Sequence, residues 1–326
     1  MRILIIGGTK FIGPRVVARL VHLGHEVTIY HRGQTEADLP CEVRHVHSEH
    51  AGAPVEKFPE ELRSWQPEAV LHMMLIGGPD AHAFVNAFAG IAPRAIAVSS
   101  GDVYRAYGVF HGMESGLERV PLTEDSPLRS VLYLYRNSPA ASPHAWLRSY
   151  DKILAEQAVL SEPRWKATIL RLPMVYGPGD GGRLTPYVKR MHAEATRLEF
   201  DECQTNWRWT RGFVDNVAAA IALAVVDDRA SGRVYNLGEP FTLTMLEWIQ
   251  EIAATTGWSG EIVPLPKNQI DPDLRLEANF DQDIWYDTSR IRSELGYAEP
   301  IPFREALVRT VEFERALNPI VASHRT

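Results

Sequence analysis

A glycine-rich turn lies directly behind an apolar run at the start of the chain, and this pairing constrains the fold more than any other feature. Residues 3–6 read Ile-Leu-Ile-Ile, and the next seven residues read GGTKFIG. A buried strand, a glycine turn and a helix in this order form a binding site for the pyrophosphate of a dinucleotide. The N–H groups at the helix start then bind the phosphates. We therefore predict cofactor binding by Gly7, Gly8, Thr9, Lys10, Phe11, Ile12 and Gly13.

The spacing of this turn has one departure. It reads G-x-x-G-x-x-G if Lys10 is counted at the middle position, where a glycine would let the backbone approach the phosphates. Apolar residues at helical spacing follow the turn, and residues 26–30 read as a second strand. The strand–helix–strand unit is thus complete within about 30 residues, which is the length that such a unit needs.

Strands and helices alternate through the first half of the chain. This alternation predicts an α/β fold with a doubly wound parallel sheet, the Rossmann fold, because it places helices on both faces of the sheet. The expected strands are 2–6, 26–30, 42–46, 69–74, 94–99 and 167–171, and the expected helices are 12–23, 58–64, 80–89 and 143–160.

The pattern changes after the Pro-Gly-Asp-Gly-Gly run at 178–182. We expect a dinucleotide-binding domain over 1–175, to which 211–240 contribute, and a smaller, partly interleaved α/β substrate-binding region over 176–326. The segment 105–141 is long, irregular and contains prolines, which is typical of a surface excursion near a ligand. The later elements are expected at 214–226 (helix), 233–237 (strand), 244–256 (helix), 259–285 (loops) and 303–316 (helix).

Composition excludes several classes of protein. The net charge of −7 disfavours a general nucleic-acid or membrane surface. Two cysteines far apart in sequence indicate neither a disulfide framework nor a metal-ligand pattern, and with no signal peptide or membrane-length run we expect a cytoplasmic protein. Three histidines lie near one another, but a His-x-His pair on a strand without carboxylates is more often surface than ligand. We therefore predict no metal at His45, His47 and His50.

The residues after the second strand bear on the choice of cofactor. An NAD site usually ends this strand with a carboxylate for the ribose 2′-hydroxyl. Here the strand runs into His31-Arg32-Gly33, and the Arg32 guanidinium matches a 2′-phosphate instead. We therefore expect NADP, with NAD as the alternative if Arg32 is a solvated loop residue.

Several later motifs carry the candidate chemistry. Residues 98–104 read VSSGDVY behind a buried-looking strand, and a serine at the carboxyl end of a parallel strand lies at the ligand edge of the sheet. Lys152 lies in a predicted helix. The further motifs are RLPMVYGPGD at 171–180, RGFVDNVAAAI at 211–221, VYNLG at 234–238 and DTSRIRSELGY at 287–297.

Together these motifs make the chain resemble an extended short-chain dehydrogenase/reductase of the NAD-dependent epimerase/dehydratase group, over nearly its whole length. The resemblance implies an NAD(P)-dependent oxidoreductase or epimerase/dehydratase-like enzyme acting on a hydroxylated small molecule such as a nucleotide sugar. The GGTKFIG start, with Pro173 before VYGP, is similar to an atypical branch of the family. That branch also holds the chloroplast RNA-associated stem-loop-binding proteins.

The resemblance also implies roles for individual residues. Ser100 and Lys152 match the family's catalytic Ser/Thr and Lys, and the lysine also binds the nicotinamide ribose. Arg211 matches an arginine that meets a nucleotide-sugar phosphate, and its setting among tryptophans suits that role. We assign Ser99 and Pro173 to the cofactor side of the site, and Asp102, Tyr104 and Arg211 to the substrate side.

The family's tyrosine is missing from its usual place four residues before the lysine. Arg148 is there instead, and arginine has no acceptor and stays protonated, so it does not act as a base. Tyr150 lies two residues before Lys152, which on a regular helix is about 200° around the axis. Three interpretations stay open: Tyr150 is the acid/base from an irregular helix start, Asp102 or Tyr104 has the role, or the chain has lost the redox chemistry.

Two functions of different classes therefore remain. One is the NAD(P)-dependent enzyme, with Ser100, Tyr150 and Lys152 as its catalytic residues. The other is a dinucleotide-sensing or RNA-associated binding protein without hydride transfer, although the acidic charge argues against RNA. We expect a small-molecule substrate, neither nucleic acid nor membrane as a partner, and, from the resemblance, a homodimer.

Overall fold

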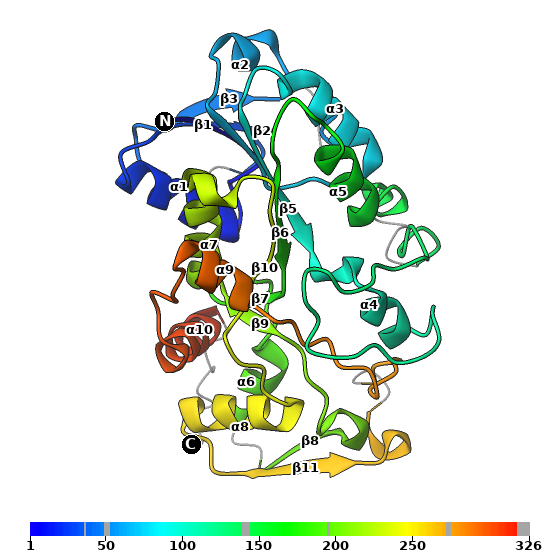
Figure 1. Cartoon of the computed structure of the whole chain (residues 1–326). Coiled ribbons are helices and arrows are strands. Elements are labelled where there is room, and N and C mark those ends of the chain that lie inside the picture. The colour runs from blue at the N-terminus through cyan, green and yellow to red at the C-terminus, as the bar shows by residue number, and fades with distance from the viewer. Residues whose placement is uncertain (36, 49–52, 139–143, 194–195, 272–274, 318–326) are drawn as a thin grey trace.

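A seven-stranded parallel sheet forms the centre of the computed structural model, which describes residues 1–326 except 36, 49–52, 139–143, 194–195, 272–274 and 318–326 (Figure 1). The strand order is β10-β6-β5-β4-β1-β2-β3, so the direction of winding reverses between β1 and β4. All neighbouring strands are parallel. The strands are β1 (Arg2–Ile6), β2 (Glu26–His31), β3 (Arg44–His47), β4 (Ala69–His72), β5 (Arg94–Ser100), β6 (Thr168–Leu172) and β10 (Val234–Asn236).

The sequence of β1 shows why this sheet is buried on both sides. Successive side chains of a strand point to opposite faces. Ile3 and Ile5 accordingly join one apolar cluster, whereas Leu4 and Ile6 join the cluster on the other face. A strand that is apolar throughout suits a parallel sheet covered by two helical layers. The predicted doubly wound α/β fold is confirmed.

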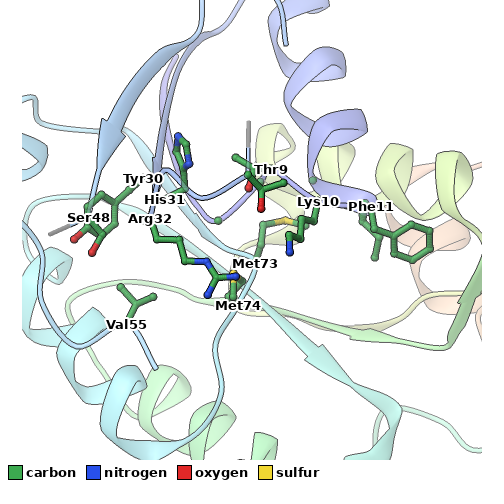
Figure 2. A pocket seen from close by; sticks show the side chains of 15 residues that line it. Thr9, Lys10, Phe11, Tyr30, His31, Arg32, Ser48, Val55, Met73 and Met74 are labelled. Carbon is green, nitrogen blue, oxygen red and sulfur yellow. The ribbon is translucent and has the colours of Figure 1, made fainter. Parts of the chain in front are cut away.

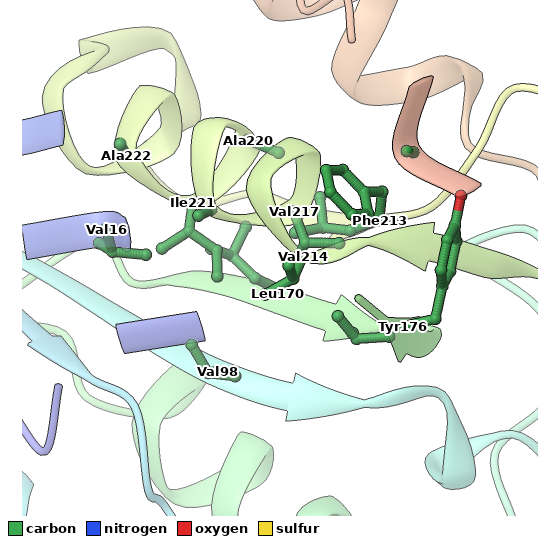
Figure 3. Close-up of a cluster of buried hydrophobic side chains, with 14 of the residues drawn as sticks. Val16, Val98, Leu170, Tyr176, Phe213, Val214, Val217, Ala220, Ile221 and Ala222 are labelled. Carbon is green, nitrogen blue, oxygen red and sulfur yellow. The ribbon is translucent and has the colours of Figure 1, made fainter. Parts of the chain in front are cut away.

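Two layers of helices cover the sheet. On one face α1 (Ile12–His22) packs against α7 (Val214–Val226), whose many alanines allow close approach to the sheet. Figure 3 shows Val217 and Ile221 of α7 above Leu170 of β6. The other face is covered by α2 (Glu60–Ser64), α3 (Gly78–Phe88) and α5 (Lys152–Leu160).

The later part of the chain adds two small sheets and further helices beyond the carboxyl ends of the strands (Figure 1). β7 (Met174–Tyr176) pairs with β9 (Arg211–Phe213), and β8 (Arg197–Asp201) pairs with β11 (Glu261–Leu265). The other helices are α4 (Arg105–Phe110), α6 (Thr185–His192), α8 (Met245–Thr256), α9 (Ser289–Leu295) and α10 (Phe303–Leu317).

One apolar cluster extends from the sheet into this later part. It contains Val16 of α1 and Leu170 of β6, and it continues through Met191 of α6 to Trp248 of α8. The division at residues 175 and 176 therefore crosses a shared core, and as a domain boundary it stays a prediction. No helix among the described residues is long and apolar enough to cross a membrane.

Four expected segments differ from the structure. The helix expected over 143–160 is confirmed only from Lys152 to Leu160, where α5 lies, because residues 145–148 form a separate short 3-10 helix. The loop-rich stretch 259–285 contains β11, and the irregular segment 105–141 opens with α4. The strand expected over 69–74 ends at His72, which leaves Met73 and Met74 outside the sheet.

Candidate functional site

The glycine turn after β1 has the tight geometry that a phosphate site needs. Gly7 and Gly8 have φ angles of 92° and 99°, in the left-handed region that favours glycine. Gly13 lies in the first turn of α1, and a Cβ there would be 2.4 Å from the Cα of Gly8. Any side chain at Gly13 would therefore push the helix away from the strand.

Arg15 of α1 holds this turn against two distant segments. Its guanidinium donates to the carbonyl oxygens of Phe11 (2.7 Å) and Pro178 (3.0 Å) and to the carboxylate of Asp215 in α7 (2.9 Å). Phe11 itself has a φ of 47°, an uncommon value for a residue with a side chain. The turn is thus fixed by contacts from α7 and from the loop after β7.

A cavity of about 210 Å³ opens at this turn. All seven residues from Gly7 to Gly13 line it, as does Arg32 (Figure 2). Lys10 and Arg32 supply positive charge, and no carboxylate is found among the described lining residues. The backbone turn and these two cations fit an anionic ligand such as a dinucleotide. The other lining residues are Tyr30, His31, Thr35, Ser48, Val55, Met73 and Met74.

Met73 and Met74 are lining residues that the sequence interpretation missed. They directly follow β4, the neighbour of β1 in the sheet. The carboxyl ends of parallel strands meet at one edge, and this rule identifies the residues after β4 as ligand-facing. Figure 2 shows the Arg32 side chain extending towards both methionines across the cavity.

A second cluster of polar residues lies where β5 ends and α5 begins. The Tyr150 hydroxyl donates to Oδ2 of Asp102 at 2.7 Å. The Ser100 hydroxyl accepts from the backbone N–H of Asp102 at 3.2 Å and so caps the 3-10 helix Gly101–Val103. The Lys152 ammonium donates hydrogen bonds to the carbonyl oxygens of Leu75 and Val98. Leu75 follows the cavity-lining Met74, so the lysine lies beside that segment.

A break in the expected helix explains how Tyr150 reaches this cluster. Asp151 is the N-cap of α5, since its carboxylate accepts from the N–H of Ile153 at 3.0 Å. Tyr150 therefore precedes the helix, and the 200° argument from a regular helix does not apply to it. Arg148, at the family's tyrosine position, lies exposed on the 3-10 helix Ala145–Arg148.

Burial shifts the proton affinities within the cluster. Burial raises the pKa of Asp102, and the hydrogen bond from Tyr150 partly opposes this rise. Burial and the Asp102 charge raise the pKa of Tyr150 well above its ordinary value. Burial lowers the pKa of Lys152, and the Asp102 and Asp80 carboxylates oppose this shift. Oδ1 of Asp102 is buried without a hydrogen-bond partner among the described residues, so this carboxyl group is suited to hold a proton.

Ser99 and Tyr104 belong to a polar core behind the cluster. The Ser99 hydroxyl donates to Glu156 at 2.5 Å, and Glu156 forms an ion pair with Arg171 at 2.7 Å. Tyr104 is fully buried; its hydroxyl donates to Asn236 and accepts from Arg171. This burial argues against the predicted contact of Tyr104 with substrate. Ser99, Lys152 and Pro173 are not among the described residues that line the cavity.

Arg211 is a buried cation that pairs with no carboxylate of the described residues. Its guanidinium donates to the carbonyl of Trp209 at 3.1 Å and contacts the Met245 sulfur, and it lies 4.4 Å from the Trp248 ring centroid. Nε has no hydrogen-bond partner among the described residues. Burial lowers the pKa of Arg211 to about 10, so it remains charged at neutral pH. An anion at this place would compensate the charge.

The fold and the glycine turn define a dinucleotide-binding α/β protein. Residues 138–238 match the model of the NAD dependent epimerase/dehydratase family, and these residues include Tyr150, Lys152 and Arg211. Over these residues the chain is similar to this family.

Similar proteins cover different shares of the chain. The uncharacterized protein y4nL of Sinorhizobium fredii is 25% identical over 60% of this chain. A dTDP-glucose 4,6-dehydratase of Streptomyces niveus is 32% identical over 31% of it. These matches span 65% and 28% of the relatives' own lengths. The fold is similar to UDP-glucuronic acid 4-epimerase from Bacillus cereus, solved with UDP-glucuronic acid and NAD, with a TM-score of 0.69, 17% identity and coverage of 97% of this chain and 100% of that one.

Proposed function

We propose that the chain is an NAD(P)-dependent oxidoreductase of the epimerase/dehydratase type that acts on a hydroxylated small molecule, with nucleotide sugars as the substrate class. One observation carries the proposal: the Tyr150 hydroxyl lies 2.7 Å from Asp102, at the ligand edge of the sheet and beside Ser100 and Lys152. A tyrosine in this place restores the proton-transfer group that Arg148 removes from the usual position.

The cluster supplies a path for one proton. In the oxidising direction, the proton of a substrate hydroxyl passes to the Tyr150 oxygen while the Tyr150 proton passes to Asp102. Tyr150 is neutral before and after, which suits its raised pKa. Asp102 ends protonated, which its burial favours because burial raises its pKa. When bound, the nicotinamide would accept or donate the hydride.

The glycine turn and Lys152 are the residues that would hold the cofactor. The N–H groups of the turn would bind its phosphates, and the Lys152 ammonium, close to the segment after β4, would bind the ribose. Arg32 favours NADP, since its guanidinium extends into a cavity without a described carboxylate.

The cofactor preference is tested by measuring the Kd of NADPH and NADH for the wild type and for Arg32→Ala. We expect the variant to bind NADPH at least about ten-fold more weakly, because it loses a charge-assisted hydrogen bond. Its Kd for NADH should stay unchanged. Arg63→Ala, which removes a partly exposed arginine of α2 outside the cavity, is the matched control. An NADPH affinity that is indifferent to Arg32 would overturn the preference.

Arg211 supports an anionic substrate. It is buried, charged and without a carboxylate partner among the described residues, as a phosphate-binding arginine would be. The dehydratase from Streptomyces niveus and the epimerase from Bacillus cereus are both named for nucleotide-sugar substrates. The substrate is therefore proposed to present its phosphate to Arg211.

The activity is tested with the full chain, both cofactors, and a panel of nucleotide sugars and simple alcohols. Nicotinamide absorbance follows net oxidation or reduction, and chromatography of the sugars detects epimerisation or dehydration, which leave the cofactor unchanged. We expect turnover of at least one nucleotide sugar. Tight cofactor binding without turnover would instead favour the dinucleotide-sensing function, and RNA binding that weakens with added salt would favour the RNA-associated one. Cytoplasmic location and a homodimer stay predictions.

A further inference from the structure

We propose that the chain binds a transition-metal ion, zinc above all, through the imidazoles of His31, His45 and His47, which we call the histidine trio. The trio lies where β2 and β3 run side by side at the outer edge of the central sheet. The proposal goes beyond the oxidoreductase function and does not depend on it.

Strand pairing brings the three residues together. His45 and His47 are two apart on β3, so their side chains lie on the same face. His31, the last residue of β2, is paired in register with His47. Paired residues of neighbouring strands also share a face. His31, which supplies the third imidazole, therefore lies on the neighbouring strand, 14 residues before His45 in the sequence.

The distances suit a metal ion. One ring nitrogen from each histidine lies within 4.8 Å of the others, and His31 Nε2 is 3.1 Å from His45 Nδ1. Two nitrogens at about 2.0–2.1 Å from a tetrahedral zinc are about 3.3 Å apart. One pair is thus already in place, and a side-chain shift of at most about 1.5 Å completes the set. His45 and His47 are exposed, so their rings have room to make that shift.

Hydrogen bonds order the two rings that lie closest. The His31 ring is buried, and the N–H of Gly33 donates to its Nδ1 at 3.3 Å. In the neutral ring the proton is therefore on Nε2, which donates to His45 Nδ1. A metal ion between these two nitrogens takes the place of that proton, which moves to His31 Nδ1 and replaces the contact with Gly33. His31 is thus the buried member of the set, to which the two exposed rings are added.

The donor set selects the class of ion. Imidazole nitrogens suit zinc, copper and nickel, whereas magnesium and calcium prefer oxygen ligands. Three histidines leave one position of a tetrahedral ion for water, and the two exposed members give the ion a path from solvent.

The sequence alone led us to predict no metal, on the basis of His45, His47 and His50. That set lacked His31, which only the strand register supplies, while His50 lies outside the described residues.

The test is a zinc titration of the full-length chain without an affinity tag, after removal of metals, against a chromophoric competing chelator. We expect one zinc ion per chain in the wild type. His45→Ala and His47→Ala should each raise the Kd at least ten-fold, because each removes a direct ligand. Both residues are exposed, so these variants should keep the melting temperature of the metal-free wild type. Cobalt in place of zinc should give the visible absorption of a tetrahedral site.

Two controls make the assignment specific. His82→Ala changes an exposed histidine of α3, and Cys41→Ser removes an exposed thiol that precedes β3. Neither should alter the Kd or the stoichiometry. The proposal is overturned if the wild type binds no zinc, or if the double variant His45→Ala/His47→Ala binds zinc with the wild-type Kd.

Discussion

Tyr150 shows how much one residue depends on the local backbone. Its spacing from Lys152 would direct it away from the site on a continuous helix. Because Asp151 caps α5, Tyr150 lies before the helix and its hydroxyl reaches Asp102. In the proposed mechanism Tyr150 thereby supplies the proton-transfer group from a neighbouring position, with the Asp102 carboxylate as its partner.

The proposed proton path predicts the effect of two substitutions. Tyr150→Phe and Asp102→Asn should each lower kcat by about 10²–10⁴-fold, the usual contribution of general acid–base catalysis. Neither change removes a group of the glycine turn. The cofactor Kd should therefore stay within about two-fold of the wild-type value, because substitutions at separate sites have independent effects.

Tyr135→Phe is the matched control for Tyr150→Phe. Its ring packs beside that of Tyr150 at 5.4 Å, and its hydroxyl meets only Tyr107 among the described residues. Activity close to wild type is expected for Tyr135→Phe. Full activity of Tyr150→Phe would remove Tyr150 from the mechanism.

Glu239 makes stability depend on pH. The pKa of Glu239 is raised from 4.5 to about 7, mainly by burial and to a smaller extent by the charge of the neighbouring Glu299. Between these values the folded chain holds a proton that the unfolded chain has lost, so the free energy of unfolding falls as pH rises from 4.5 through about 7. Glu239→Gln should remove this dependence and be more stable than wild type at pH 8, by up to about 3 kcal/mol.

The measurement is urea unfolding of both proteins at a series of pH values from 5 to 8. Glutamine keeps an oxygen that accepts from the Tyr176 hydroxyl and the Phe213 N–H, as Glu239 does. The difference between the two proteins should therefore grow with pH. A constant difference would show that Glu239 titrates normally.

At the scale of elements, the glycine turn and α1 form one unit. Gly13 allows α1 to lie against Gly8, and Arg15 ties the turn to α7 and to the loop after β7. Gly13→Ala should therefore lower the free energy of unfolding by about 2 kcal/mol or more, since the new methyl group overlaps backbone. It should also abolish cofactor binding.

Gly78→Ala is the control for this change. Gly78 is likewise in the first turn of a helix, but its Cβ would make only an ordinary contact of 3.8 Å with Leu154. We expect that variant to be as stable as wild type or up to about 1 kcal/mol more stable. Equal cofactor affinity in the two variants would contradict the role given to Gly13.

The same scale shows what sequence patterns predict and what they miss. The strands around the glycine turn were predicted within a few residues, because a strand buried on both faces leaves a continuous apolar run. The start of the helix expected over 143–160 was wrong because its apolar spacing continued through Ser149–Asp151, whereas the helix begins after the N-cap at Asp151. Among the residues that line the cavity, 7–13 and Arg32 belong to one strand–helix–strand motif and were therefore predicted from the sequence. Met73 and Met74 become visible only once strand order is known.

At the scale of the whole molecule, the shared apolar cluster bears on how the protein unfolds. The two predicted regions share this cluster, since it contains Val16 and Leu170 of the first region and Met191 and Trp248 of the second. We expect one cooperative thermal transition, with tryptophan fluorescence and far-ultraviolet circular dichroism giving the same midpoint. Two separate midpoints would show that the regions unfold independently.

The shared core also limits how substrate enters. A two-lobed enzyme can open like a hinge only if its lobes slide or part at a loosely packed interface. Here such opening would expose the side chains that join α6 and α8 to the sheet. For the proposed enzyme we therefore expect ligands to enter and leave by rearrangement of surface loops rather than by parting of the two regions.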